Sequence, residues 1–414
     1  MSKYSYLNRV RVEVEQLKIG MYVGELDKPW EESSFLFQGF NIEDDETISK
    51  LRNECSHVFV DFKDEQEYEN HLLEIEKSAE SDFAIDASLS EELPKALKVI
   101  KDSARELKLL MRKIQRGDTI QLSEIDAIVE ACLESLDRNN RALVILCNIK
   151  HKIFYSAEHP LRVAIFAMAF AKNLKMSEEQ LQVMGSSAML HDIGKFAIPE
   201  RVLNKTDELT KQEKLMLRRH PIQSYKMLDQ VDGVTEAIKE VALSHHERVD
   251  GKGYPRNIPQ ERVSRFAKIV SIIDAYDAIT SDRPHKEGKS PSYAFKILNN
   301  YKGVKFDEYL VSEFVKWMGV MPVGSLVEMA TGEVGIVLKN CLQQKLRPKV
   351  LLVTDERKKQ GFQKIVDLSQ MDLHASGQEY RVKSVLPNSS FGINIEHYLD
   401  SQTFDAPKWL GPGV

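Results

Sequence analysis

Apolar residues recur at helical spacing through most of the chain. The stretch ALKVIKDSARELKLLMRKIQ, which begins at residue 96, places its apolar side chains on one helix face, at Leu97, Ile100, Ala104, Leu107, Leu110 and Met111. A second helix is predicted from about residue 123 to 136. Ser177 with Gln180 and Thr210 with Glu213 have the spacing of capping boxes, so each pair predicts a helix start.

The two ends of the chain alternate apolar and polar residues instead. VRVEVEQL, MYVGEL, SFLFQGF and CSHVFVDF near the N-terminus are typical of half-buried strands, and DDETISKLRNEC between them predicts a short helix. Near the other end, VGSLVEMATGEVGIVL predicts two strands around a Thr-Gly turn, and KVLLVTD predicts a third.

These patterns predict a mainly α protein, with an all-helical core between two smaller β-rich parts. A chain of 414 residues is longer than one ordinary core requires. The predicted parts are a small β-rich N-terminal module (1–62), a charged, partly helical linker (63–95), a helical connector packing on the core (96–144), the helical core domain (145–318), a small β-rich C-terminal appendage (319–390) and a tail (391–414).

Composition narrows the functional classes. The net charge of -6 argues against a general nucleic-acid or membrane binder, so an anionic ligand would need a local cluster of cations. The four cysteines are far apart and form no CxxC pair, which indicates reduced thiols. The N-terminal residues lack the apolar core of a signal peptide, and the longest apolar runs are too short to cross a bilayer. We therefore expect a cytoplasmic protein.

Histidines gather in the predicted core. Five of the eleven lie between residues 159 and 246, beside an Asp, a Pro or a Gly-rich loop. Asp274 falls inside the apolar stretch FAKIVSIIDAYDAI, where an unpaired carboxylate would be costly and a cation would relieve that cost. Any one of these histidines, taken alone, is better explained as a surface or core residue, and an isolated His-Asp pair carries little information. The clustering of these histidines is the observation that favours a metal site.

Mixed imidazole and carboxylate ligands without thiolates suit iron or manganese better than structural zinc. Five histidines and two aspartates are too many ligands for one ion but enough for two. Two neighbouring ions can polarise a phosphoryl oxygen and generate hydroxide at neutral pH, which is the chemistry of phosphoester hydrolysis.

Four segments resemble, in order and spacing, the successive motifs of HD-GYP domains: HDIGKFAIPERVLNK (191–205), RRHP (218–221), HHERVDGKGYP (245–255) and IIDAYDAITSDRPHK (272–286). YSAEHPLRV (155–163) resembles the opening motif of the family. The resemblance covers about residues 145–318. Residues 9–62 are similar to a small module that often precedes this domain in bacteria.

The resemblance implies an HD-type catalytic core with metal ligands at His159, His191, Asp192, His220, His245, His246 and Asp274, Asp192 bridging two ions. It implies catalytic roles for Asp192 and Lys195. The substrate-binding residues that it implies are Lys195, Arg283, Lys286 and, in the GYP loop, Gly251, Gly253, Tyr254 and Pro255. Lys205 is a weaker candidate, and an ordinary solvated lysine is favoured there.

Two positions depart from the family pattern. Members with three metals carry a Glu four residues before the first His, where this chain has Tyr155, so two metals are expected. The family usually has Tyr after Arg-Pro, where this chain has His285, for which a surface position is favoured.

The implied activity is hydrolysis of a cyclic dinucleotide second messenger, cyclic di-GMP, to linear pGpG. Whether a second cut then yields GMP is left open by the sequence. A 3′,3′-cyclic GMP-AMP phosphodiesterase remains an alternative, and so does a non-catalytic cyclic dinucleotide receptor. A general HD phosphohydrolase is disfavoured by the complete GYP loop. Binding of signalling partner proteins at the GYP loop and formation of a homodimer are both possible from the sequence.

In the N-terminal module, the aromatic side chains are expected to form the small core: Trp30, Phe35, Phe37 and Phe40.

Overall fold

The computed structural model describes residues 8–14, 17–28, 33, 35, 39–55, 57–62, 89–118, 120–149, 158–203, 205, 207–282, 287–340, 344, 346–369, 379–387 and 390–393. The chain divides into two compact units, Met1–Ile85 and Asp86–Val414.

The N-terminal unit is a four-stranded antiparallel sheet with one helix. The strands β1 (Asn8–Glu13), β2 (Tyr22–Leu26), β3 (Phe40–Asn41) and β4 (His57–Phe62) are arranged in the order β1-β4-β2-β3, and α1 (Asp45–Glu54) lies between β3 and β4 in the chain. The Asp44 side chain caps α1 by accepting a hydrogen bond from the backbone N–H of Thr47. Phe35 and Phe40 stack against the small core, as expected, whereas Trp30 and Phe37 lie outside the described residues.

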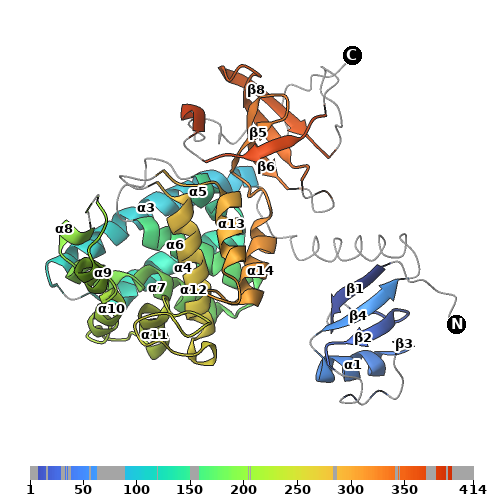
Figure 1. The fold of residues 1–414 in the computed structure, drawn as a ribbon, viewed down its shortest axis with the longest axis horizontal. Coiled ribbons are helices and arrows are strands. Elements are labelled where there is room, and N and C mark those ends of the chain that lie inside the picture. Colours follow the sequence, from blue (N-terminus) through green and yellow to red (C-terminus); the bar gives the residue numbers. More distant parts are fainter. Residues whose placement is uncertain are drawn as a thin grey trace. The chain divides into compact units, whose positions relative to one another are not determined.

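The second unit is built mainly from helices (Figure 1). They are α3 (Leu89–Gln115), α4 (Leu122–Arg138), α5 (Ala142–Ile149), α6 (Glu158–Asn173), α7 (Glu178–Leu190), α8 (Glu200–Leu203), α9 (Lys211–Leu217), α10 (His220–Leu228), α11 (Glu236–Ser244), α12 (Arg265–Thr280), α13 (Pro291–Asn300) and α14 (Glu308–Met318), with short 3-10 turns η3 (Ile193–Ala197), η4 (Gln260–Arg262) and η5 (Ser390–Gly392).

Helices α6 and α12 pack against each other at the centre of this unit (Figure 1). The apolar run AIFAMAFA makes α6 buried on nearly every side, which is why its sequence shows little amphipathic pattern. Both predicted capping boxes are confirmed: Ser177 accepts from the N–H of Gln180 at the start of α7, and Thr210 from the N–H of Glu213 at the start of α9.

The connector helices α3 and α4 bury their apolar stripes in the same core as α6 and α7. A partly buried ion pair joins them: the buried Glu92 of α3 accepts hydrogen bonds from Arg138 at 2.9 and 3.0 Å and from Ser135 at 2.9 Å. Helix α3 begins at Leu89, so its first turns lie in the segment that the sequence predicts as a partly helical linker.

A five-stranded antiparallel sheet follows the helices. Its strands are β5 (Leu326–Met329), β6 (Val334–Lys339), β7 (Lys349–Thr354), β8 (Gln360–Asp367) and β9 (Val382–Val385), in the order β8-β7-β6-β5-β9. Along β7, Leu351 and Val353 pack on the helical core, while Val350 and Leu352 pack into a separate cluster on the other face. Strand β7 is therefore buried on both faces, which explains its continuous apolar run.

The mainly α fold class with β-rich ends is therefore confirmed. In the part of the chain that the structure describes, none of the helices combines the length and the apolar character needed to traverse a bilayer. Cys55, Cys132 and Cys147 are buried and form no disulfide among the described residues, while Cys341 lies outside them.

Candidate metal centre

Three histidines stand at helix ends that converge in the second unit. His191 follows the last residue of α7, His245 follows the last residue of α11, and His220 is the first residue of α10. All three side chains are almost fully buried. The helix ends therefore fix the positions of three imidazoles in one place.

Each of these imidazoles is oriented by a backbone carbonyl three residues earlier. The Nδ1 to carbonyl distances are 2.6 Å for His191 and Ala188, 2.7 Å for His220 and Leu217, and 3.0 Å for His245 and Ala242. The last carbonyls of a helix have no partner within the helix, so they accept an N–H from the ring. With its proton on Nδ1, each ring turns the lone pair of Nε2 toward the interior of the cluster.

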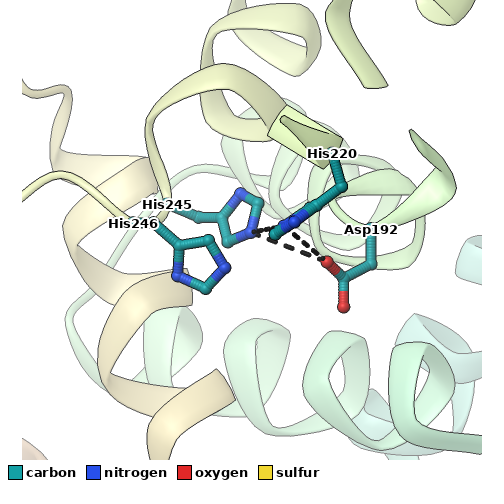
Figure 2. Close-up of side chains that lie close together, drawn as sticks. All are labelled: Asp192, His220, His245 and His246. Carbon is teal, nitrogen blue, oxygen red and sulfur yellow. Dashed lines mark hydrogen bonds and ion pairs between the residues drawn. The ribbon is translucent and has the colours of Figure 1, made fainter. Parts of the chain in front are cut away.

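Asp192 lies between two groups of histidines. Its Oδ1 is 3.2 Å from Nε2 of His220 and 3.7 Å from Nε2 of His245. Its Oδ2 is 3.3 Å from Nε2 of His191 and 3.7 Å from Nε2 of His159. Figure 2 shows His220 and His245 pointing at the same carboxylate oxygen, with His246 beside them. One carboxylate thus faces two sets of nitrogen donors, one through each oxygen.

The polar atoms of this cluster are arranged to coordinate a cation rather than to form hydrogen bonds with one another. Nε2 of His191 and Oδ1 of Asp192 are buried without a hydrogen-bond partner. Nε2 of His220 and Nε2 of His245 are 3.3 Å apart. With protons on Nδ1, these nitrogens present lone pairs to each other and to a carboxylate, which is unfavourable unless a cation lies among them. The residues present therefore fit divalent metal ions.

Two sets of donor atoms are close enough to hold an ion: Asp192, His220, His245 and His246 in one, and His159, His191 and Asp192 in the other. Asp274 joins the second set, because its Oδ1 is 3.1 Å from Nε2 of His159. All seven residues that the sequence suggested as metal ligands are thus brought together.

Sequence analysis missed the residues that hold His159. Its Nδ1 is 2.8 Å from Oδ2 of Asp277, a fully buried carboxylate one helical turn beyond Asp274 on α12. Arg162, one turn after His159 on α6, donates to Asp277 through Nε at 2.8 Å and Nη2 at 3.0 Å. The signal was the spacing of three residues on each helix, which places each pair of side chains on one face.

The pKa values of the histidines in this cluster are shifted in opposite directions by their surroundings. Burial disfavours the charged imidazolium of His159, but hydrogen bonds to Asp274 and Asp277 outweigh it and raise its pKa to about 9. Burial lowers the pKa of His246 to about 4 and the pKa of His245 well below its usual range. For Asp192, burial opposes ionisation, but Lys195 and His191 hold its pKa well below the usual value.

Lys195 extends from η3 and forms an ion pair with Oδ2 of Asp192, while 38% of its side chain remains exposed. An ammonium group thus lies beside the candidate bridging carboxylate and is open to a ligand. Lys205 differs: it pairs with Glu213 at 2.7 Å and lowers the pKa of that carboxyl to about 2. The structure gives Lys205 a partner away from the cluster.

The GYP loop is held against the cluster by backbone contacts and by Glu247. This buried carboxylate accepts the N–H of Arg256 at 2.6 Å and belongs to neither donor set. A Cβ on Gly253 would lie 2.4 Å from the backbone of Glu247. The Tyr254 ring packs beside the His246 ring, with centroids 4.7 Å apart, and the Tyr254–Pro255 peptide is cis.

Gly194 and Ser224 hold the turn after His191 against α10. The Ser224 hydroxyl accepts the N–H of Gly194 at 2.8 Å and donates to the carbonyl of His191 at 3.0 Å. A Cβ on Gly194 would come within 2.2 Å of the carbonyl of His220. Only glycine permits this approach.

Four positions that the sequence suggested cannot be placed. The substrate-binding candidates Arg283 and Lys286 lie outside the described residues, as do the two departures from the family pattern, Tyr155 and His285.

The sequence is similar to known protein families and to several named proteins. Residues 128–310 match the family described as HD domain, and residues 9–125 match a domain of unknown function, DUF3391. A protein of Pseudomonas aeruginosa named as a cyclic di-GMP phosphodiesterase is 30% identical over 92% of this chain and 93% of its own length.

Other relatives match a smaller share of the chain. The cyclic di-GMP phosphodiesterase response regulator RpfG of Xanthomonas campestris is 33% identical over 47% of this chain and 50% of its own length. The 3′3′-cGAMP-specific phosphodiesterase 1 of Vibrio cholerae is 30% identical over 38% of this chain and 37% of its own length. Among solved structures, an HDG"Y"P protein of Bdellovibrio bacteriovorus aligns at a TM-score of 0.47 and 16% identity, over 75% of this chain and 99% of that one.

Proposed function

The chain belongs to the HD-domain family, in its HD-GYP type with an N-terminal DUF3391 module, and from this membership we propose that it hydrolyses cyclic di-GMP. The proposed reaction is metal-dependent cleavage of a 3′–5′ phosphodiester, which opens the ring to linear pGpG. A second cut to GMP is an outcome for the assay to decide.

The position of Asp192 between two donor sets is the observation that carries this proposal. We propose that the site would hold two divalent ions and that both would share Asp192. His159, His191 and Asp274 would hold one of them, and His220, His245 and His246 the other. Imidazole and carboxylate donors without thiolates favour iron or manganese.

When bound, such a pair of ions polarises a phosphoryl oxygen and lowers the pKa of water. The residues of the chain do the rest. Lys195 lies beside Asp192 and is exposed enough to contact a phosphate, so its ammonium stabilises the negative charge that develops there. Asp277 and Arg162 keep the His159 ring in place. The GYP loop forms one wall of the site through Tyr254.

A turnover assay tests the proposal. The protein is purified without oxygen, loaded with ferrous iron or manganese, and incubated with cyclic di-GMP, and the products are separated by chromatography. We expect cleavage by the wild type and none by Asp192→Ala. Asp229→Ala, which removes a surface carboxylate paired with Lys239 at 2.8 Å, is the matched control and should retain activity. Wild-type protein that holds two metals without cleaving the substrate would contradict the enzymatic assignment.

Two alternatives are separated by the same assay. Relatives in Vibrio cholerae are named 3′3′-cGAMP-specific phosphodiesterases, so 3′,3′-cyclic GMP-AMP is tested beside cyclic di-GMP and the faster substrate identifies the messenger. A non-catalytic receptor would bind a cyclic dinucleotide stoichiometrically without turnover. The exposed ammonium of Lys195 beside Asp192 favours catalysis, because binding alone needs no such pairing.

Partner proteins at the GYP loop, a homodimer and a cytoplasmic location remain proposals from the sequence. Cys55, Cys132 and Cys147 form no disulfide among the described residues, which supports a reducing compartment. Co-purification, analytical ultracentrifugation and fractionation test these three points.

A further inference from the structure

One cation at the candidate centre has no role in the metal chemistry. Arg218 follows the last residue of α9, two residues before His220, and its side chain is exposed. Its guanidinium carbon lies 5.3 Å from the centroid of the Tyr254 ring. Among the residues that the structure describes, no carboxylate lies within ion-pair distance of this guanidinium. The charge of Arg218 is therefore available to a ligand.

Tyr254 connects Arg218 to the donor cluster. The centroid of its ring is 4.7 Å from that of the His246 ring and 6.5 Å from that of the His220 ring. The ring is only partly buried, so it offers an aromatic surface at the edge of the cluster. Arg218 and Tyr254 thus form a planar cation and an aromatic ring in contact, directly beside two candidate metal ligands.

This pair fits a nucleobase better than a second phosphate. A guanidinium carries its N–H donors in one rigid plane, so two of them can form paired hydrogen bonds to the edge of a planar group. In a dinucleotide whose phosphate lies at the metal site, a base lies only one sugar away from that phosphate.

The donor pattern of arginine selects guanine. The O6 and N7 atoms of guanine are two acceptors at the spacing of two guanidinium N–H groups, whereas the corresponding edge of adenine carries an amino donor beside N7. We propose that Arg218 binds the O6/N7 edge of a guanine base of the substrate, while Tyr254 holds the guanidinium beside the donor cluster. This inference rests on the proposed function and adds the specificity of the site.

The test compares Arg218→Ala and Arg218→Lys with the wild type, all loaded with metal. For each protein, kcat/KM for cyclic di-GMP is divided by kcat/KM for bis(p-nitrophenyl) phosphate, a diester without a nucleobase. We expect this ratio to fall about 5- to 150-fold in both variants, because Lys keeps the charge but loses the fork of donors. Arg219→Ala removes the neighbouring exposed arginine, whose side chain forms no hydrogen bond, ion pair or ring contact with the residues that the structure describes, and should leave the ratio unchanged.

A cyclic di-GMP analogue with 7-deazaguanine, which lacks the N7 acceptor, isolates the proposed contact. With this analogue, we expect the ratio to be lowered in the wild type and the further effect of Arg218→Ala to shrink. An equal effect of Arg218→Ala on both dinucleotides, or full activity of Arg218→Lys, would overturn guanine recognition and indicate a phosphate contact.

The wild-type rates separate this inference from the proposed function. If the wild type cleaves bis(p-nitrophenyl) phosphate but neither cyclic di-GMP nor 3′,3′-cyclic GMP-AMP, the proposed substrate is wrong. The proposed role of Arg218 is then wrong as well. If the wild type cleaves cyclic di-GMP and Arg218→Ala keeps the wild-type ratio, only the role of Arg218 is wrong.

Discussion

Nδ1 of His159 and Oδ2 of Asp277 lie 2.8 Å apart, although 118 residues separate them in the chain. A carboxylate that accepts the Nδ1–H of a histidine fixes the ring and leaves Nε2 as the metal donor. Asp277 is itself held by Arg162 through two hydrogen bonds. The contact between α6 and α12 thus positions one ligand of the candidate centre.

The first prediction concerns Asp277. In Asp277→Asn the side chain keeps its shape but loses its charge, so the hydrogen bond that it accepts from the His159 ring weakens and Arg162 loses a charged partner. We expect metal affinity to fall about 10- to 100-fold and the free energy of unfolding to fall by about 1.5–3 kcal/mol. Metal titration and chemical denaturation measure the two effects, with Asp229→Asn as a surface control. Unchanged metal affinity would remove Asp277 from the centre.

The second prediction is a pH dependence of metal binding. The pKa of His159 is raised to about 9 in the metal-free protein, so its ring is protonated near neutral pH and metal must displace that proton. His246, with a pKa lowered to about 4, is already neutral. We therefore expect apparent affinity for the ion beside His159 to rise about tenfold per pH unit from about pH 6.5 to 9. Calorimetry in buffers of different ionisation enthalpy counts the released proton, and an affinity independent of pH would contradict the prediction.

The third prediction separates catalysis from metal binding at Lys195. Lys195→Ala removes the exposed ammonium beside Asp192 without removing a candidate ligand. We expect kcat to fall about 10²- to 10³-fold while the protein still binds two metals. Metal analysis and steady-state kinetics test this together. Lys113→Ala, which breaks a surface ion pair with Glu124 at 2.6 Å, should keep the wild-type kcat.

The fourth prediction uses two glycines of the GYP loop. A Cβ at Gly253 would lie 2.4 Å from backbone atoms of Glu247 and Arg248, so Gly253→Ala must displace the loop that carries Tyr254. At Gly251 the nearest atom to a Cβ is 3.9 Å away and the cost comes from its φ of +71°, about 1–2 kcal/mol. We expect Gly253→Ala to lose more activity and more thermal stability than Gly251→Ala. The reverse order would show that the backbone conformation, not the close approach, limits this loop.

Local sequence patterns predicted several features that the structure confirms. The capping boxes at Ser177 and Thr210 involve residues three positions apart, so they can be recognised without knowledge of the fold. The helix DDETISKLRNEC became α1, and the Thr-Gly turn joined β5 to β6. Strands β8 and β9 were not predicted individually, because residues 360–367 and 382–385 show little clean alternation.

The candidate site divides in the same way. The sequence by itself suggested the seven candidate ligands and Lys195, because the segments that carry them resemble the successive motifs of HD-GYP domains. Only the tertiary structure decided that Asp192 faces two donor sets, that helix-end carbonyls orient three imidazoles, that Asp277 holds His159 and that Arg218 contacts Tyr254. The physical reason is that these contacts depend on how distant helices pack, and a local pattern of apolar and polar residues determines which face of a helix is buried but not which partner that face meets.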